Sequence, residues 1–369
     1  MAEIICYEPL ATDRADAWHR VTAPGGFEYW HFDAVGTGLS AGVQIEAAIF
    51  DGCPLDGAYQ RRYAAYRRWP THVRPPVARE YPGAFLAVYR QGRPAVQWLT
   101  RFAPGSIRAS SEDLDVALGS CRAVAQSDGV HLRMTCNRIK SAGCELVFEP
   151  ATFPETIQHA LASRGEAALE HRWIVGSLAC RASGYVEHAG QRIEFTGIGY
   201  RDHFFATAPP PGCWLWGRVV SQEHSTAFWL TGTGKKVAAF VMDGDGIVRV
   251  SHAAELSDFR RAGFAQRYPR SIRIETTGGE LQLTGGSLVG RSPLHLRLGF
   301  EANWYPRRAD VQAGGHVGWA LPTISAEKTV GDAHPTFSGS SAVCHMVFAD
   351  RAGWPVLGRL IERLVLQRD

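Results

Sequence analysis

The sequence predicts an all-β, mainly antiparallel protein made of two similar β-barrels or sandwiches in tandem, with two helices added. Three observations lead to this class. Apolar and polar residues alternate with a period of two, for example in residues 130–136 and 271–275, which is typical of strands with one buried face. Gly, Pro and Asp turns separate these segments. Helices and strands do not alternate along the chain, so α/β folds with parallel sheets fit poorly.

The elements of the first half start with an aromatic-rich strand at residues 27–32, followed by a second strand at 42–50. A helix is predicted at about residues 56–69, because Pro70 ends the helical pattern. It would act as a short lid. Further strands are predicted at residues 84–89, 95–100, 144–148 and 173–180.

The second half repeats the opening of the first. A strand rich in Trp at residues 214–218 is followed by a second strand at 227–231, and two more are predicted at 281–283 and 294–298. The Pro-rich residues 206–212 form a linker. We therefore expect an N-terminal β-domain at residues 1–208 and a C-terminal β-domain at 209–350. Residues 351–369 are expected to form a C-terminal amphipathic helix, since Pro355 precedes apolar residues at i, i+3 and i+4 spacing.

The composition is that of a globular protein and excludes several functional classes. The 369 residues suffice for two domains, and 45% of them are hydrophobic against 20% charged. Net charge is only +3, from 39 Lys and Arg against 36 Asp and Glu, so nothing favours a nucleic-acid partner. The Arg-rich residues 59–68 are a local exception, which we interpret as a solvated helix face.

The sequence also predicts a cytoplasmic protein without a metal. The first residues lack a basic start followed by an apolar run, and no window approaches 18 apolar residues, so neither a secretory signal nor a membrane span is expected. Peripheral membrane contact stays open. The eight cysteines form no C-x-x-C pair, which favours reduced thiols. The histidines show no zinc-ligand spacing, although ligands from distant strands stay open.

The most informative segment is residues 197–205, which read GIGYRDHFF. Alternation along a strand places Tyr200, Asp202 and Phe204 on one side, and Arg201 and His203 on the other. A carboxyl group buried among aromatic rings could protonate an apolar substrate and then face the resulting cation. A structural Asp at a strand end is the alternative. His203 would relay a proton or position Asp202 through a neighbour, or be a structural histidine.

Two aromatic strands supply candidate substrate-binding residues. Consecutive side chains of the first strand point to opposite faces, so only one face of this strand lines an interior. Trp30 could instead fill the floor of a barrel. In the second strand Trp214 and Trp216 share a face that Arg218 continues; this arginine either pairs with Asp202 or Glu28, or binds a carbonyl or carboxylate of the substrate. The candidates are Tyr29, Trp30, His31, Phe204, Trp214, Trp216 and Arg218.

Three motifs in order, at residues 24–34, 197–203 and 214–218, resemble the lipocalin-like hydroxyneurosporene synthase family, which includes the carotenoid 1,2-hydratases. Fungal lipocalin-like Diels–Alderases are similar in fold. The resemblance implies two lipocalin-like β-domains with a pocket at or between them, and neither a metal nor a nucleotide cofactor. The chain departs from the family at residues 203–206, where His-Phe-Phe-Ala replaces small polar residues and a Gly. This departure leaves hydration itself open.

We therefore expect an enzyme of secondary metabolism that acts on a terpenoid, carotenoid or polyketide polyene without a cofactor. It would hydrate or cyclise a C=C bond, with Asp202, His203 and Tyr200 as catalytic residues. The second hypothesis is a Diels–Alderase-type pericyclase, in which Tyr29, Tyr200 or Arg218 donates a hydrogen bond to a carbonyl. The third is a lipocalin-like carrier without chemistry.

Overall fold

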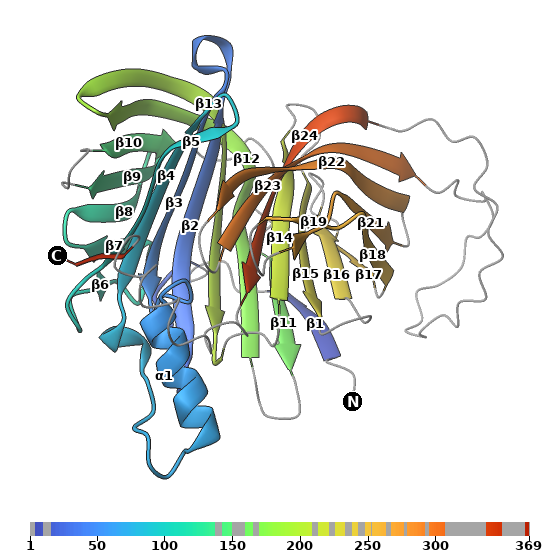
Figure 1. Ribbon diagram of the computed structural model, residues 1–369. Coiled ribbons are helices and arrows are strands. Elements are labelled where there is room, and N and C mark those ends of the chain that lie inside the picture. Colours follow the sequence, from blue (N-terminus) through green and yellow to red (C-terminus); the bar gives the residue numbers. More distant parts are fainter. Residues whose placement is uncertain are drawn as a thin grey trace.

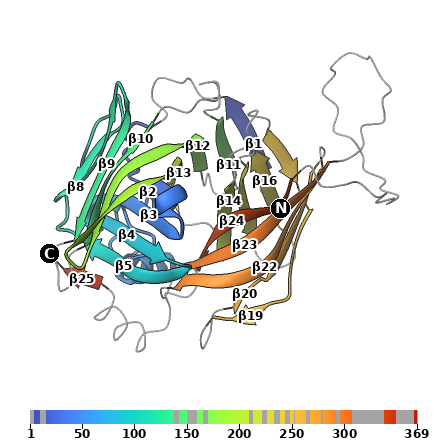
Figure 2. The same ribbon diagram turned by 90° about the horizontal axis from the view of Figure 1, so that it is seen from above.

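The protein is an antiparallel β structure in which two large curved sheets lie beside each other (Figures 1 and 2). The computed structural model describes residues 4–9, 16–136, 142–149, 159–164, 170–208, 213–220, 226–232, 238–242, 248–251, 253–262, 267–276, 279–291, 295–306, 337–348 and 366–368. Each large sheet curls into a half-barrel (Figure 2). The predicted all-β, lipocalin-like class is therefore confirmed.

The first sheet has 14 strands and contains both the first and the last strand of the described chain. Its order is β25 (Leu366–Arg368), β5 (Arg93–Arg101), β4 (Gly83–Arg90), β3 (Val43–Asp51), β2 (Phe27–Gly36), β13 (Gln191–Ala206), β12 (Glu170–His188), β10 (Ala142–Phe148), β9 (Gly129–Cys136), β8 (Cys121–Gln126), β7 (Asp115–Leu118) and β6 (Arg108–Ala109). Outside this path, β1 (Ile4–Pro9) pairs with β11 (His159–Arg164), which pairs with β12.

The second sheet has nine strands and begins after the linker, so the chain passes from one sheet to the other between Ala206 and Cys213. Its order is β17 (Val248–Ser251), β16 (Ala238–Met242), β15 (Thr226–Gly232), β14 (Cys213–Val220), β24 (Phe337–Phe348), β23 (His295–Pro306), β22 (Gly279–Arg291), β21 (Ser271–Thr276) and β18 (Ala253–Ser257). A separate two-stranded sheet joins β19 (Arg260–Arg261) to β20 (Arg267–Tyr268).

The alternation seen in the sequence divides the first sheet into two apolar faces. Inside the half-barrel, one cluster includes Phe32, Ile45 and Leu86. The opposite faces of β2, β3, β4, β12 and β13 carry a second cluster, which Trp216 of β14 in the second sheet joins. A third cluster fills the second half-barrel. The second cluster, which we call the inter-sheet cluster, thus lies where the two sheets meet and surrounds the candidate site.

Helix α1 (Gly57–Arg68) confirms the helix predicted from the sequence. The side chain of Asp56 caps it by accepting a hydrogen bond from the amide of Ala58, and Trp69 ends it just before Pro70. The helix packs against the start of β2, where Gly25 has a φ of 79° and a Cβ at that position would collide with the ring of Tyr63. Two short 3₁₀ helices complete the described helices, η2 (Gly38–Ser40) and η3 (Ala78–Glu80).

The division into domains at residue 208 stays a proposal, although the change of sheet falls within the predicted linker. The predicted C-terminal helix falls mainly on residues 351–365, outside the described residues, and the structure assigns Leu366–Arg368 to β25. Within the described part of the chain, none of the helices combines the length and apolar character needed to cross a bilayer. Four cysteines that the structure describes are buried free thiols, at Cys53, Cys121, Cys144 and Cys180.

Candidate active site between the two sheets

Strand β13 directs Tyr200, Asp202 and Phe204 into the inter-sheet cluster, as the alternation predicts. The strand lies between β2 and β12, so each of its residues has a neighbour on both sides. Asp202 is opposite His31 in β2 and opposite Val175 in β12. All three predicted side chains are buried, with Asp202 only 3% exposed.

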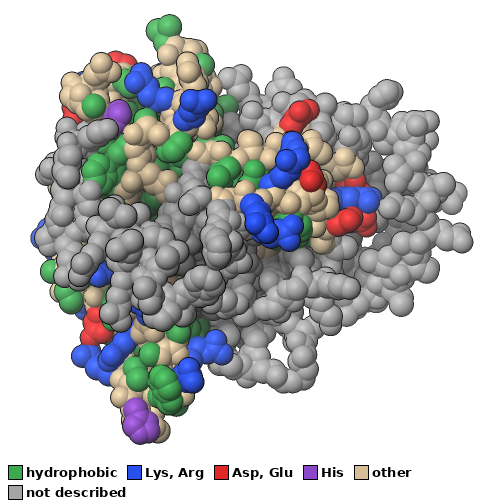
Figure 3. Space-filling view, viewed as in Figure 1, with side chains coloured by type: hydrophobic (Ala, Val, Ile, Leu, Met, Phe, Trp, Pro, Cys, Tyr) green, Lys and Arg blue, Asp and Glu red, His purple; other side chains and the backbone are tan. Residues whose placement is uncertain are grey.

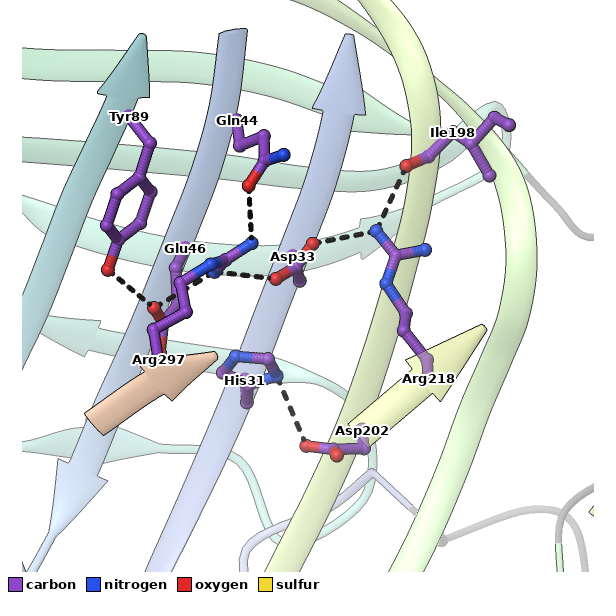
Figure 4. Close-up of polar contacts among 9 residues, drawn as sticks. All are labelled: His31, Asp33, Gln44, Glu46, Tyr89, Ile198, Asp202, Arg218 and Arg297. Atoms are coloured by element: carbon purple, nitrogen blue, oxygen red, sulfur yellow. Dashed lines mark hydrogen bonds and ion pairs between the residues drawn. The ribbon is translucent and has the colours of Figure 1, made fainter. Parts of the chain in front are cut away.

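The carboxyl group of Asp202 is held by two neutral donors. Its Oδ2 accepts a hydrogen bond from Trp173 Nε1 at 2.9 Å and another from Tyr200 Oη at 2.7 Å. Its Oδ1 lies 3.5 Å from Nδ1 of His31 (Figure 4). Because Oδ2 is occupied by the two donors, the geometry orients Oδ1 toward His31.

Burial keeps the hydroxyl groups around Asp202 protonated. It raises the pKa of Tyr200 well above the ordinary value of 10.0, and the charge of Asp202 raises it further. The pKa of Tyr29 is raised for the same two reasons. Tyr200 therefore serves as a hydrogen-bond donor and not as a base.

Trp173 is a site residue that the sequence analysis placed in a strand but did not assign to the site. It precedes Ile174 and Val175 in β12, in a run that reads as an ordinary apolar strand. Only the register between β12 and β13 reveals that its indole reaches Asp202. The sequence could have assigned Trp173 to the site only if the pairing of β12 with β13 had been known.

Aromatic rings form the surroundings of the carboxyl group. Phe204 stacks on Tyr29 with ring centroids 5.4 Å apart. Trp216 meets His31 edge-on at 4.5 Å and lies parallel to Tyr200 at 6.5 Å. The predicted substrate-binding residues Tyr29, His31, Phe204 and Trp216 thus lie together around Asp202. The side chain of Trp214, a further predicted substrate-binding residue, is outside the described residues.

A buried charge network adjoins this aromatic group and joins the two sheets (Figure 4). Arg218 of β14 donates from Nη2 to Asp33 Oδ1 at 2.7 Å and to the carbonyl oxygen of Ile198 at 3.3 Å. Nη1 of Arg297 in β23 lies 2.8 Å from Asp33 Oδ2 and 3.0 Å from Glu46 Oε2.

Neighbouring side chains complete the network. Gln44 accepts from Arg297 Nη2 at 3.3 Å, and Tyr89 donates to Glu46 Oε2 at 3.1 Å. Burial lowers the pKa of Arg297, but the charges of Asp33 and Glu46 outweigh burial and raise it. Two arginines thus face two carboxylates.

This network corrects one expectation. Arg218 pairs with Asp33, and not with Asp202 or Glu28 as the sequence analysis offered. The reason is geometric, because Asp33 follows His31 by two residues in β2 and so projects from the same face toward β14. Arg218 also lies over the ring of Tyr200, at 5.5 Å from its centroid.

His203 lies on the face of the first sheet opposite Asp202, as alternation predicts, and Trp30 lies on that same opposite face, inside the first half-barrel. His203 Nε2 is 3.0 Å from Glu28 Oε1, and its ring stacks on Trp30 at 4.9 Å. Trp30 belongs to the cluster inside the first half-barrel and donates from Nε1 to the carbonyl oxygen of Asp16. Neither side chain reaches the inter-sheet cluster, because odd and even positions of a strand face opposite sides.

His203 takes part in the one group of potential metal ligands found among the described residues, which also contains His19 and Glu28. Nδ1 of His19 lies 3.2 Å from the same oxygen of Glu28. Burial raises the pKa of Glu28, but hydrogen bonds from both histidines outweigh burial and lower it. These hydrogen bonds account for the arrangement, and the expected absence of a metal stays a prediction.

Two surface hollows lie apart from Asp202, on strands β6 to β10 and β12 of the first sheet. Arg122 and Arg133 line both of them. The first also contains Asp115 and the second Glu145 and Tyr185. Both linings mix charged side chains with apolar and small residues.

The fold and the buried inter-sheet group define a lipocalin-like β protein, and the comparisons agree. No family model matches the chain. The chain is 24% identical over 313 residues to hydroxyneurosporene dehydrogenase of Chlorobaculum tepidum, which covers 76% of this chain and 78% of that protein. The resemblance to the lipocalin-like hydroxyneurosporene synthase family, indicated by the three motifs, is thereby confirmed.

Two solved structures share the fold. An AttH candidate protein from Nitrosomonas europaea superposes with a TM-score of 0.59 at 14% identity, covering 92% of this chain and 97% of that one. Kievitone hydratase from Nectria haematococca superposes with a TM-score of 0.54 at 11% identity, covering 92% and 93%. At these identities the similarity concerns the fold alone.

Proposed function

We propose that this chain is an enzyme that protonates a C=C bond of a hydrophobic, unsaturated small molecule, without a cofactor, and then hydrates or cyclises it. The observation that carries the proposal is the buried carboxyl group of Asp202, which two neutral donors orient within an aromatic cluster. The name of the bacterial relative refers to a carotenoid, and a hydratase shares the fold. Both support this general kind of enzyme.

The proposed chemistry starts at Asp202. Burial disfavours a charged carboxyl group, so the proton can pass to the less substituted carbon of an alkene. The tertiary cation that results is stabilised by the π faces of Tyr200 and Trp216. Water then adds to the cation in a hydratase, and the protonated alcohol loses a proton; in a cyclase a second C=C bond attacks the cation, and the new cation loses a proton from carbon. The proton released in this step returns to Asp202 directly or through His31, whose Nδ1 lies 3.5 Å away.

Arg218 would bind an oxygen of the substrate. It is 2% exposed, and its Nε and Nη1 have no hydrogen-bond partner among the described residues, while Nη2 is held by Asp33. A buried donor left unpaired costs about 1–3 kcal/mol, which a carbonyl, carboxylate or hydroxyl of the substrate would recover. Tyr29, Phe204 and Trp216 would contact its hydrocarbon part, with Trp214 as a further candidate.

The test compares Asp202→Asn with the unchanged protein. Asparagine keeps the size and the acceptor oxygen but cannot donate an acidic proton. We expect turnover to fall by a factor on the order of 10²–10⁴ while binding of the ligand persists. Asp115→Asn is the matched control, because Asp115 is exposed and pairs with Arg122 on the surface. Full activity of Asp202→Asn would refute the mechanism.

The substrate is sought by mass spectrometry. The protein is incubated with hydrophobic metabolites from its own source in ordinary and in heavy water. A product heavier by one water, or an isomer that carries one deuterium at carbon, would establish proton-initiated chemistry. Recovery of enriched but unchanged ligand would instead indicate a carrier.

The donors of Arg218 favour a pericyclase as the second candidate function. A hydrogen bond from Arg218 to a carbonyl would polarise a polyene that the inter-sheet cluster holds in a reactive conformation. In that case the product is an unlabelled isomer in heavy water. Arg218→Met would then lose activity and Asp202→Asn would keep it.

A further inference from the structure

Positive charge is concentrated in the residues that run from α1 to the start of β4. Residues 57–79 contain no Asp or Glu and six arginines, Arg61, Arg62, Arg67, Arg68, Arg74 and Arg79. The net charge of the whole chain is only +3. The positive charge of this segment alone therefore exceeds the net charge of the whole chain. Glu80, which follows the segment, forms an ion pair with Arg74.

The helix turns its tyrosines toward the body and its arginines toward solvent. The hydroxyl of Tyr59 donates to the carbonyl oxygen of Gly26, and Tyr63 packs against Gly25. Three arginines and the tryptophan that ends the helix are exposed, and we call them the α1 surface: Arg62, Arg67, Arg68 and Trp69. The segment projects at the lower end of the molecule, where basic and apolar side chains gather (Figures 1 and 3).

The α1 surface combines the two features that bind an interface between water and lipid. Trp69 is 49% exposed, although a large apolar ring in water is unfavourable, and the guanidinium of Arg68 lies 4.5 Å from its ring centroid. Tryptophan favours the level of the headgroups, and each arginine near an anionic bilayer strengthens binding about fivefold. A nucleic acid would satisfy the charges, but the substrate argues for lipid.

The position of α1 connects this surface to the candidate site. Tyr59 of α1 belongs to the same inter-sheet cluster as Tyr29, Phe204 and Trp216, which surround Asp202. An uninterrupted group of apolar side chains thus leads from the base of the helix to the carboxyl group. A hydrophobic polyene dissolves in membranes. It would therefore reach the protein from the bilayer, at the end of the inter-sheet cluster that lies beside α1.

We propose that the α1 surface docks the protein on anionic lipid headgroups, so that the substrate passes from the bilayer to the inter-sheet cluster. The choice of lipid as the partner and the direction of passage rest on the proposed function, whereas the binding of vesicles is measured independently of it. Three exposed arginines supply the attraction, and Trp69 inserts among the headgroups.

The experiment is co-sedimentation of the full chain with vesicles, in the absence of any substrate. We expect binding to vesicles that contain phosphatidylglycerol, little binding to pure phosphatidylcholine, and weakening by salt. The triple variant Arg62→Glu, Arg67→Glu, Arg68→Glu should lose binding by a factor on the order of 100 or more. Its matched control changes three exposed arginines of the first sheet, Arg93→Glu, Arg108→Glu and Arg133→Glu, and should bind nearly as well as the unchanged chain.

A second pair of variants tests the tryptophan. Trp69→Ala should weaken vesicle binding, whereas Leu39→Ala should not, although Leu39 is more exposed than Trp69. Leu39 follows the end of β2, and α1 packs against its start. Circular dichroism would show that the variants keep the fold.

Four outcomes would overturn the proposal: no binding to either kind of vesicle, equal binding to both, equal loss in both triple variants, or preferential binding to single-stranded RNA over anionic vesicles. The vesicle measurement does not depend on catalysis. Asp202→Asn should therefore bind vesicles as the unchanged chain does, and an active Asp202→Asn would refute the proposed function while leaving the docking intact.

Discussion

At the scale of single residues, the environment of Asp202 combines effects that oppose each other. Burial among rings favours the neutral carboxyl group, and hydrogen bonds from Trp173 and Tyr200 favour the ionised one. An acid that must release a proton and later recover it benefits from such a balance. The position of His31 close to Oδ1 gives the returning proton a second acceptor.

Tyr200→Phe tests this balance. The change removes the hydroxyl that donates to Asp202 Oδ2 and leaves the ring that packs beside Trp216. We expect kcat to fall about 10- to 100-fold, an effect smaller than the loss of a whole acid, with little change in KM. The alkaline limb of the pH–rate profile, where Asp202 loses its proton, should move to higher pH, because the ionised carboxyl group has lost a donor. Tyr185→Phe, toward the other end of β12, should change neither kcat nor the pH–rate profile.

Asp51 provides a test of stability against pH. Burial raises its pKa from 3.8 to about 6, the hydrogen bond from Trp18 lowers it, and the charge of Glu28 raises it. The folded state therefore binds a proton that the unfolded state has released between about pH 4 and pH 6, and unfolding becomes easier as the pH rises through this range. The loss of stability caused by burying the ionised Asp51 is fully present above about pH 6 and absent below about pH 4.

Asp51→Asn mimics the protonated side chain and should remove this penalty. At pH 8 we expect the variant to be more stable than the unchanged protein, by up to about 3 kcal/mol. The difference should shrink toward zero near pH 4. Urea denaturation at several pH values measures it, and a difference that does not depend on pH would contradict the assignment.

The sequence could predict which site residues lie together only when those residues belong to the same strand. Alternation sufficed to group Tyr200, Asp202 and Phe204, and to separate His203 from them. It could not show that Trp30 faces the other core, since a single aromatic strand offers both faces. Trp173 and the partner of Arg218 required the register and the packing of distant strands.

At the scale of elements, both ends of α1 could be predicted from the sequence alone. Asp56 caps the helix, Pro70 follows its end, and both are visible in the sequence. The long strands β12 and β13 show the opposite case. Their pairing shifts register between Val175 and Ser177 and again between Ser177 and Cys180, and such irregularities are set by packing that local patterns do not encode.

The cap of α1 allows a comparison of two variants at one position. Asp56 accepts from the amide of Ala58 and also forms an ion pair with Arg101 of β5. Asp56→Ala removes both and should lower the free energy of unfolding by about 1–3 kcal/mol. Asp56→Asn keeps the cap and removes the charge, so it should be intermediate. Equal effects of the two variants, measured by urea denaturation, would show that the cap contributes nothing.

At the scale of the whole molecule, the buried charges between the sheets decide how the two halves are joined. Arg218 and Arg297 come from the second sheet, and their partners Asp33 and Glu46 come from the first. No composition or periodicity could have paired residues so far apart in the sequence. The fold class and most strands followed from alternation, but the interface depends on contacts that only the assembled sheets create.

Arg297→Met tests the junction. The change leaves Glu46 and part of Asp33 buried without this partner, which should destabilise the protein by roughly 3–5 kcal/mol. Arg273→Met is the control, because Arg273 is more exposed and pairs with Glu275 and Glu280 within the second sheet. It should change stability by less than about 1 kcal/mol. Thermal unfolding of both variants measures the difference.

The pairing of β25 has a consequence for handling the protein. Leu366–Arg368 run parallel to Leu99–Arg101 and cover the outer edge of β5. Without them, β5 would present unpaired backbone groups, which invite strands of other molecules to add to the sheet. A fragment of residues 1–208 would lack this cover as well as both interface arginines. Such a fragment should aggregate on expression, so the first sheet is best studied with the whole chain attached.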